Sequence, residues 1–192
     1  MKIERINDQI RFLNEIDKLK SINRATNLGD NSRRENSAEH SWHVTLFALI
    51  LSEHAEKEVD IFKVVKMLLI HDIVEIDAGD NPIFGNYDIK SLYDIEQKAS
   101  QRIFGLLPED QAKEMLNIWN EFENCKTPTA KFAKAMDRFQ APNQNLMCGG
   151  GTWVEYKVNY DQIEKKVGSK IALAAPKLWN WLKPRLKDYF KT

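Results

Sequence analysis

Hydrophobic residues recur at spacings of three and four along almost the entire chain, and this spacing is typical of helices that bury one face. The pattern predicts helices at residues 3–16, from about 36–37, from about 60, at 88–106, at 108–123, from about 127–128 and at 177–190. The sequence shows no convincing pair of strands, internal repeat or interdomain linker. We therefore predict an all-α fold in which residues 1–192 form a single compact helical domain.

Two segments interrupt this helical pattern. The stretch "SINRATNLGDNSRREN", residues 21–36, is rich in Gly, Asn and Ser and predicts a loop. Asn36 is followed three residues later by Glu39, a capping-box pattern that predicts the start of the next helix. The run "GGGT", which ends at Thr152, predicts a flexible connector, and Thr152 with Glu155 predicts another capping box.

Composition narrows the class of protein. The chain has 192 residues, of which 43% are hydrophobic and 29% are charged, as in an ordinary globular domain. Lys plus Arg and Asp plus Glu each number 28, which argues against a nucleic-acid partner or a charged membrane surface. No apolar run approaches the ~20 residues of a membrane span, and the charged N-terminus is unlike a secretion signal. Cys125 and Cys148 lack metal-like spacing, so we expect a cytoplasmic protein with reduced thiols.

The most apolar helix ends in a cluster of acids, within "LLIHDIVEIDAGD" at residues 68–80. Leu68, His71 and Glu75 follow one another at spacings of three and four, and Asp72 lies beside them. His71, Asp72 and Glu75 therefore continue the stripe that should face the core. Burying unpaired carboxylates is costly, and this segment contains no Lys or Arg. The compensating charge must come from elsewhere in the fold, either from Arg and Lys on other helices or from a metal ion.

A pair of histidines strengthens the metal interpretation. In "NSAEHSWHV", His40 lies in the first turn of the predicted second helix and His43 follows three residues later. Imidazole and carboxylate together suit divalent transition metals, so His40, His71, Asp72 and one further acid would form a mixed site. We expect His43 to pack beside such a site. The alternative is that each histidine is a hydrogen-bonded core residue and that Asp80 is only a turn residue.

These residues resemble the pattern of the HD-domain metal-dependent phosphohydrolases, most closely the 5'-deoxynucleotidase branch of small helical proteins. The superfamily's pattern of His, His-Asp and a distant Asp falls on His40, on His71 and Asp72, and on Asp137 in "FAKAMDRFQ". "RRENSAEHSWH", "HDIVEIDAGD", "RIFGLLPED" and "TWVEYKVNYDQI" resemble further motifs of this branch. The resemblance covers residues 19–181. It implies that the four side chains hold one divalent transition metal ion (Mn, Fe, Co, Ni or Zn).

The resemblance also implies roles for other residues. Glu75 would be the acid–base group, and Asp80 would support it or the leaving group. Arg24 in "INRA" matches an arginine that contacts the nucleotide. Arg33 and Arg34 would either add charge for binding phosphate or remain solvated loop residues. The implied reaction is hydrolysis of a small phosphate ester, a nucleoside or deoxynucleoside 5'-monophosphate, by a homodimer.

The substrate stays open at the sequence level. Relatives often carry Trp directly after the arginine that Arg24 matches, but this chain has Ala25, so the sugar pocket should be more permissive. The substrate could instead be a phosphonate, a nucleoside triphosphate or a non-nucleotide monoester. A different alternative is a non-catalytic module that binds metal or nucleotide and serves as a sensor or scaffold.

Overall fold

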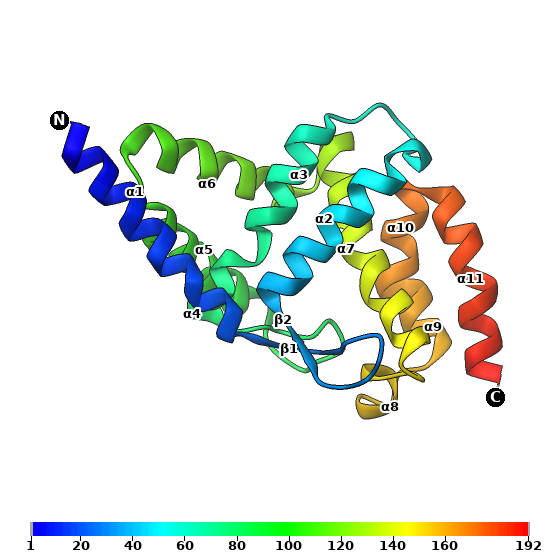
Figure 1. The fold of residues 1–192 in the computed structure, drawn as a ribbon. Helices are drawn as coiled ribbons and strands as arrows, with labels where there is room; N and C mark the ends of the chain where they lie inside the picture. Colours follow the sequence, from blue (N-terminus) through cyan, green and yellow to red (C-terminus); the bar gives the residue numbers. More distant parts are fainter. Residues whose placement is uncertain (1, 192) are drawn as a thin grey trace.

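The computed structural model describes residues 2–191, which form a bundle of helices with one short pair of strands (Figure 1). The longer helices are α1 (Lys2–Ile16), α2 (Ser37–Leu51), α3 (Ile61–Ile70), α5 (Ile89–Phe104), α6 (Glu109–Asn124), α7 (Pro128–Met147) and α11 (Pro176–Lys191). The shorter elements are η1 (Asp17–Ser21), β1 (Asn23–Asn27), β2 (Arg34–Asn36), η2 (Ser52–His54), η3 (His71–Val74), α4 (Glu75–Ala78), α8 (Thr152–Glu155), α9 (Tyr160–Ile163), η4 (Glu164–Gly168) and α10 (Ser169–Ala174). The all-α prediction is confirmed apart from the small sheet. Within residues 2–191, no helix is both long enough and apolar enough to cross a membrane.

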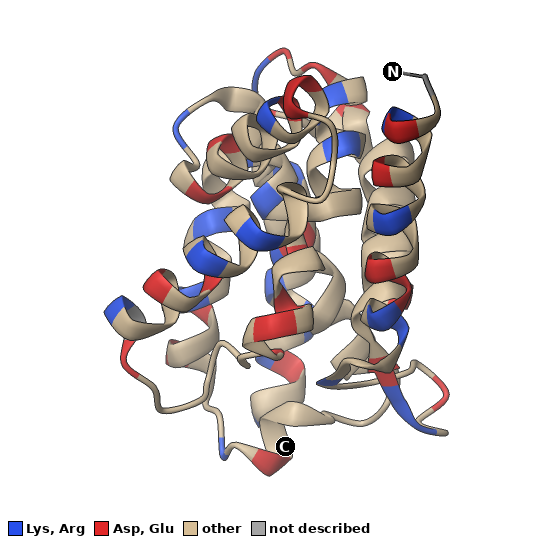
Figure 2. Cartoon of the chain, turned by 90° about the vertical axis from the view of Figure 1, so that its left-hand side faces the viewer, with Lys and Arg blue, Asp and Glu red and all other residues tan. Residues whose placement is uncertain are grey.

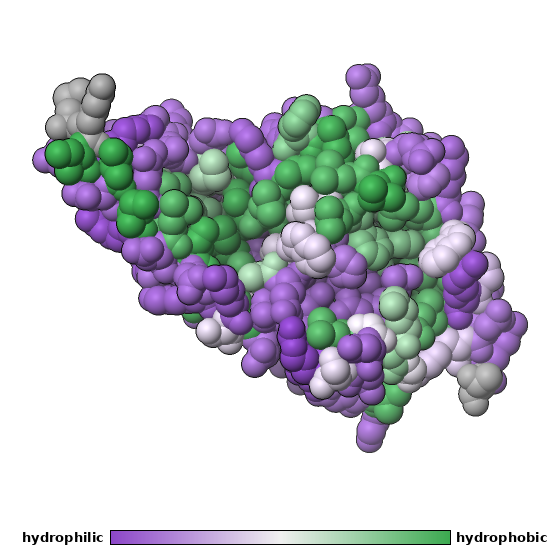
Figure 3. Space-filling view, in the orientation of Figure 1, coloured by the Kyte–Doolittle hydropathy of each residue, from purple (hydrophilic) through white to green (hydrophobic). Residues whose placement is uncertain are grey.

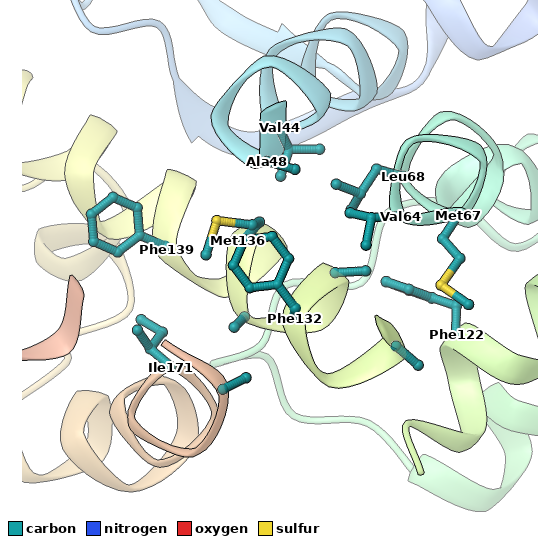
Figure 4. Close-up of a cluster of buried hydrophobic side chains, with 14 of the residues drawn as sticks. Val44, Ala48, Val64, Met67, Leu68, Phe122, Phe132, Met136, Phe139 and Ile171 are labelled. Carbon is teal, nitrogen blue, oxygen red and sulfur yellow. The ribbon is translucent and has the colours of Figure 1, made fainter. Parts of the chain in front are cut away.

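Helix α7 occupies the centre of the fold. It contacts α2, α3 and α6 as well as α10 and α11 (Figure 1). Phe132 and Met136 of α7 are fully buried, and they lie near Ala48 of α2 and Val64 of α3 (Figure 4). This close packing fixes the positions of α2, α3 and α7 relative to one another, and the predicted metal ligands lie on or directly after these three helices.

Capping side chains set the starts of two of these helices. Asn36 accepts a hydrogen bond from the backbone N–H of Glu39 at 2.9 Å, and the Glu39 carboxylate accepts one from the N–H of Asn36 at 3.1 Å. The predicted capping box at the start of α2 is therefore confirmed. The Thr127 hydroxyl accepts a hydrogen bond from the N–H of Ala130 at 3.1 Å, and α7 begins at Pro128, as the sequence predicts.

The sequence analysis assumed one continuous helix through the acidic cluster, but the structure divides this segment into three elements. Helix α3 ends at Ile70, and η3 forms a 3-10 turn before α4 begins. Side chains repeat every three residues in a 3-10 turn, so the stripe changes direction here. The turn leaves His71 and Asp72 both buried. Gly79 follows α4 with a φ of 74°, and it ends the helix as expected of glycine.

The segment predicted to be a loop contains a two-stranded antiparallel sheet. Strands β1 and β2 pair with Asn23 opposite Asn36, and the register is irregular along the pair. The loop prediction is wrong because both strands are short and polar, so they lack the alternating apolar residues that indicate a strand. The sheet places Arg24 of β1 and Glu35 of β2 beside the buried acids.

The segment predicted to be a flexible connector is a tight turn. Gly149, Gly150 and Gly151 have φ values of 73°, 109° and 44°, a region that favours glycine. A side chain on Gly150 would overlap the hydroxyl of Tyr189. Thr152 is the first residue of α8, with Gly151 at the cap position and no capping side chain, so the second predicted capping box is wrong.

The apolar stripe of α1 faces solvent. Four of its residues are about half exposed or more, namely Ile3, Ile6, Ile10 and Leu13. The helix is held on its other side, where Phe12 packs against Phe104 of α5 with ring centroids 6.2 Å apart. Acidic and basic residues alternate along α1 around this stripe (Figure 2).

Candidate active site

Three segments that are distant in sequence bring the four predicted ligand side chains together. His40 lies in the first turn of α2, and Asp137 lies in the middle of α7. The Nε2 atom of His40 is 3.2 Å from Oδ1 of Asp137 and 3.9 Å from Oδ2 of Asp72. The Nε2 atom of His71 is 3.0 Å from Oδ1 of Asp72 and 3.8 Å from Oδ1 of Asp137. The two imidazoles and two carboxylates therefore face one another.

The outer nitrogens of both histidines are held in place. Nδ1 of His71 donates a hydrogen bond to the carbonyl oxygen of Leu68 at 2.8 Å, and Nδ1 of His40 lies 3.2 Å from Oε1 of Gln140. A proton on each Nδ1 leaves the Nε2 lone pair directed at the carboxylates. The buried Nε2 of His71 has no hydrogen-bond partner within residues 2–191. This is the orientation of a metal-binding imidazole.

The donor set fits a divalent transition metal. One ligand atom from each of His40, His71 and Asp72 lies within 4.8 Å of the others, and all three residues are buried. Burial alone would lower the pKa of His71, but the neighbouring Asp72 and Asp137 carboxylates raise it to about 10, so a bound metal would displace a proton from Nε2. The two carboxylates favour a cation at this point, and a buried mixture of nitrogen and oxygen donors suits a divalent transition metal.

Arg24 supplies part of the compensating positive charge that the acidic cluster requires. Its Nη1 atom lies 3.0 Å from Oδ2 of Asp72, 3.5 Å from Oδ1 of Asp80 and 4.0 Å from Oε1 of Glu75. Its Nε atom lies 3.5 Å from Oε2 of Glu35. The expectation of an arginine from another part of the fold is therefore confirmed, and Arg24 balances the acids on one side of the candidate metal centre.

Glu75 and Asp80 are carboxyl groups whose environment favours the protonated form. Burial, followed by the Asp72 charge, raises the pKa of Glu75 well above its usual value. Its Oε2 atom accepts a hydrogen bond from the Ser37 hydroxyl at 2.5 Å. Burial also raises the pKa of Asp80, whose Oδ2 accepts the backbone N–H of Ala25 at 3.2 Å. Carboxyl groups with raised pKa values are suited to hold and release a proton during a reaction.

Three of the four side chains of the candidate centre, His71, Asp72 and Asp137, line a pocket of about 350 Å³, a size typical of small-molecule sites. The predicted residues that line this pocket are Arg24, His71, Asp72, Glu75, Asp80 and Asp137. Several aromatic side chains also line it, namely Phe84, Tyr87, Phe122, Trp153 and Tyr156. Ala25 lies in the lining as well, so a small side chain bounds this part of the pocket.

Arg33 and Arg34 lie outside the pocket lining. Arg33 forms a two-point ion pair with Glu39 at 2.6 and 2.8 Å, and Arg34 pairs with Glu155 at 2.7 Å. Both arginines are exposed or nearly so, and the structure gives them partners on the surface rather than in the site. His43 lies beside the candidate metal centre, as expected: its Nδ1 is 3.2 Å from Nε2 of Gln140, which also contacts His40, and its ring packs against Phe47 with centroids 4.9 Å apart.

Glu35 is a residue of the site that the sequence reasoning did not single out. It is buried, and its Oε1 accepts a hydrogen bond from Nε2 of Gln140 at 3.0 Å. Its Oε2 lies 3.5 Å from Nδ1 of His40 and 3.5 Å from Nε of Arg24. Burial raises the pKa of Glu35, but His40 and Arg24 outweigh that effect and lower it. Its only signal in the sequence is its place five residues before His40.

Lys134 and Arg138 also line the pocket, one turn apart on α7. The sequence reasoning did not include them, although Arg138 directly follows the predicted ligand Asp137.

Comparison with known proteins agrees with this geometry. A family model described as the HD domain matches residues 16–179. The crystal structure of a predicted metal-dependent phosphohydrolase from Magnetospirillum magnetotacticum is 42% identical, with a TM-score of 0.91, over 98% of this chain and 96% of that chain. The 5'-deoxynucleotidase HDDC2 of Dictyostelium discoideum is 28% identical over 138 residues, which are 69% of this chain and 68% of the relative.

The bovine 5'-deoxynucleotidase HDDC2 (Bos taurus) is 29% identical over 131 residues, or 67% of this chain, and the match spans 62% of the relative's length. The domain match spans most of the chain and includes all four residues of the candidate metal centre. The chain therefore belongs to the HD-domain family.

Proposed function

We propose that this protein is a metal-dependent phosphohydrolase that releases phosphate from a small phosphomonoester, a nucleoside or deoxynucleoside 5'-monophosphate. The observation that carries the proposal is the convergence of His40, His71, Asp72 and Asp137, of which the last three line a pocket that also contains Glu75. The names of the similar proteins support the same reaction, since they include metal-dependent phosphohydrolase and 5'-deoxynucleotidase.

The four residues of the centre would hold one divalent ion, and their nitrogen and oxygen donors favour Mn, Fe, Co, Ni or Zn. When bound, such an ion polarises a phosphoryl oxygen and lowers the pKa of water. The chain's own contribution starts with the outer contacts. The Leu68 carbonyl fixes the His71 ring, while Gln140 fixes the His40 ring. Removing these contacts would weaken the site without removing a ligand.

Proton transfer falls to Glu75 and Asp80. Water adds to phosphorus as the bond from phosphorus to the sugar oxygen breaks, so one proton must leave the water and one must reach the departing oxygen. Glu75 is suited to this exchange because its pKa is raised and Ser37 binds its Oε2, which leaves Oε1 for the reaction. The backbone N–H of Ala25 orients the Asp80 carboxylate, which would support Glu75 or the leaving group.

Arg24 contacts three of these carboxylates, so it holds Asp72, Glu75 and Asp80 in one arrangement. It also lines the pocket, and its contact with the nucleotide stays a prediction. Ala25 leaves that part of the wall open. We therefore expect ribonucleotides and deoxyribonucleotides to be accepted with similar efficiency.

A panel of nucleoside mono-, di- and triphosphates, each in ribose and deoxyribose form, tests the proposal. The protein is first stripped with a chelator and then supplied with one divalent ion at a time. We expect inorganic phosphate from monophosphates, and only after an ion is restored. Release of pyrophosphate or triphosphate instead would identify another substrate, and retained nucleotide binding without turnover would favour a sensor or scaffold.

We further propose that the active form is a cytoplasmic homodimer. Exposed apolar residues occur on three helices, namely Ile3, Ile6, Ile10 and Leu13 of α1, Leu46, Leu49 and Ile50 of α2, and Phe62 and Leu69 of α3. They contribute to a hydrophobic surface that extends across this face of the molecule (Figure 3). Monomers rarely expose so large a patch, and a second copy is the simplest partner. The cytoplasmic assignment agrees with two unpaired cysteines, which are usual where thiols stay reduced.

A further inference from the structure

The cations of the pocket differ in how far neighbouring groups already compensate their charge. Within residues 2–191, its lining contains three Lys or Arg side chains, namely Arg24, Lys134 and Arg138. Arg24 is enclosed by four carboxylates. Lys134 donates a hydrogen bond to Oε1 of Glu123 at 3.1 Å, and its Nζ lies 3.7 Å from the centre of the Phe122 ring. Two of the three cations therefore have close partners before any ligand arrives.

Arg138 is the exception. Its one ion pair with the described residues joins Nη1 to Oδ2 of Asp137 at 3.8 Å, which is longer than a hydrogen bond. One third of its side chain is exposed, and it lines the pocket directly beside the candidate metal centre. The N–H donors of Arg138 therefore stay available to a ligand in the pocket.

An anionic substrate needs such a cation. The lining contains six acids, namely Asp72, Glu75, Asp80, Glu96, Glu123 and Asp137. A phosphomonoester carries about −1.5 to −2 charges at neutral pH. Its phosphate would be repelled by this lining unless positive charge remained after the internal ion pairs are formed.

We propose that Arg138 binds the phosphate group of the substrate, an inference that rests on the phosphohydrolase function proposed above. A guanidinium presents a planar fork of N–H donors that matches two phosphate oxygens. Its neighbour Asp137 belongs to the candidate metal centre, so a phosphate drawn to that centre comes within reach of Arg138. Arg138 would then have the phosphate-binding role that the sequence analysis considered for Arg33 and Arg34.

The test uses Arg138→Ala, Arg138→Lys and a matched control, Lys131→Ala. Lys131 lies on the same helix, two turns earlier, and its replacement removes one positive charge outside the pocket lining. Calorimetry measures the binding of inorganic phosphate to each protein after loading with the same divalent ion, and steady-state assays give KM and kcat. Metal content and melting temperature confirm that each variant is folded and loaded.

We expect Arg138→Ala to weaken phosphate binding and raise KM by about 10- to 100-fold, the loss typical of one charge-assisted contact. Metal content should be unchanged, and kcat should fall less than KM rises. Lysine should restore only part of the binding because it lacks the fork. Lys131→Ala should match the unmodified protein.

Unchanged phosphate binding and KM in Arg138→Ala would overturn the inference, as would an equal loss in Lys131→Ala. Failure of the proposed function can be distinguished from failure of the Arg138 inference. If the unmodified protein hydrolyses no phosphomonoester but loses phosphate binding with Arg138→Ala, the anion site stands and the reaction does not. If it hydrolyses monophosphates and both Arg138 variants keep its KM, the reaction stands and Arg138 is excluded.

Discussion

Replacing Glu75 with Gln separates the group that moves protons from the groups that hold the metal. The Glu75 side chain is buried, its Oε2 accepts the Ser37 hydroxyl, and its Oε1 lies 4.0 Å from Arg24. An amide has nearly the same shape, and its oxygen can still accept the Ser37 hydrogen bond. Glu75→Gln should therefore fold and bind metal normally while losing proton exchange at this position.

The expected loss of rate follows from the role assigned to the carboxyl. General acid–base catalysis contributes about 10²- to 10⁴-fold, which corresponds to roughly 3–5 kcal/mol of barrier. We expect kcat to fall by that factor and KM to change little. Phosphate release under saturating substrate gives kcat, and elemental analysis of the same samples gives the metal content. Asp77→Asn is a matched control, because Asp77 is a neighbouring acid that pairs with Arg102 and lies outside the pocket lining.

Two results would refute this reasoning. A Glu75→Gln protein that turns over at the unmodified rate would show that the raised pKa of Glu75 has no part in the reaction. A Glu75→Gln protein that loses its metal would show that Glu75 is a ligand. An equal loss of rate in Asp77→Asn would point to a general effect of charge on the site.

Arg24→Ala should lower the free energy of unfolding by about 3–5 kcal/mol in urea, because it leaves buried carboxylates unpaired; a loss below about 1 kcal/mol would contradict the charge balance described here. The double variant Ile6→Glu, Ile10→Glu should be a monomer by light scattering with a lower kcat per chain, because the dimer is the proposed active form; a persistent dimer would exclude the α1 face from the interface. Burial and then the Glu123 charge raise the pKa of Glu96 to about 7, above the value of 4.5 expected when unfolded. Between these two pKa values the folded protein keeps a proton that the unfolded chain releases, so its stability falls as the pH rises from 4.5 to about 7. Glu96→Gln should therefore raise the free energy of unfolding by about 1–2 kcal/mol near pH 8 and by little near pH 4.5. An equal gain at both pH values would argue against a raised pKa of Glu96.

Hydrophobic spacing was sufficient to predict the helices that carry the site. It placed His71 on the buried face that follows α3, because that position extends a stripe of core residues. Capping signals at Asn36 and Thr127 fixed where α2 and α7 begin. These are local effects, and each involves residues three or four positions apart.

The features of the site that the sequence did not predict depend on contacts between residues far apart in the sequence. Glu35 belongs to a polar strand of the kind that periodicity does not detect, and it contacts Gln140 from a distant helix. The sequence assigned Arg24 to the substrate, yet most of its ion-pair partners lie about fifty residues further along the chain, on η3 and beyond. The difference between Arg33 and Arg138, one paired on the surface and one open to the pocket, exists only in the folded chain.

Metal stoichiometry measured together with phosphate release tests the central claim most directly. The chain should bind about one divalent ion after chelation and reconstitution, and phosphate release should return in proportion to the bound ion. Asp137→Ala should lose both, because it removes one of the four side chains of the centre. Hydrolysis by the chelated protein, or an Asp137→Ala protein that keeps a full complement of metal, would contradict the account.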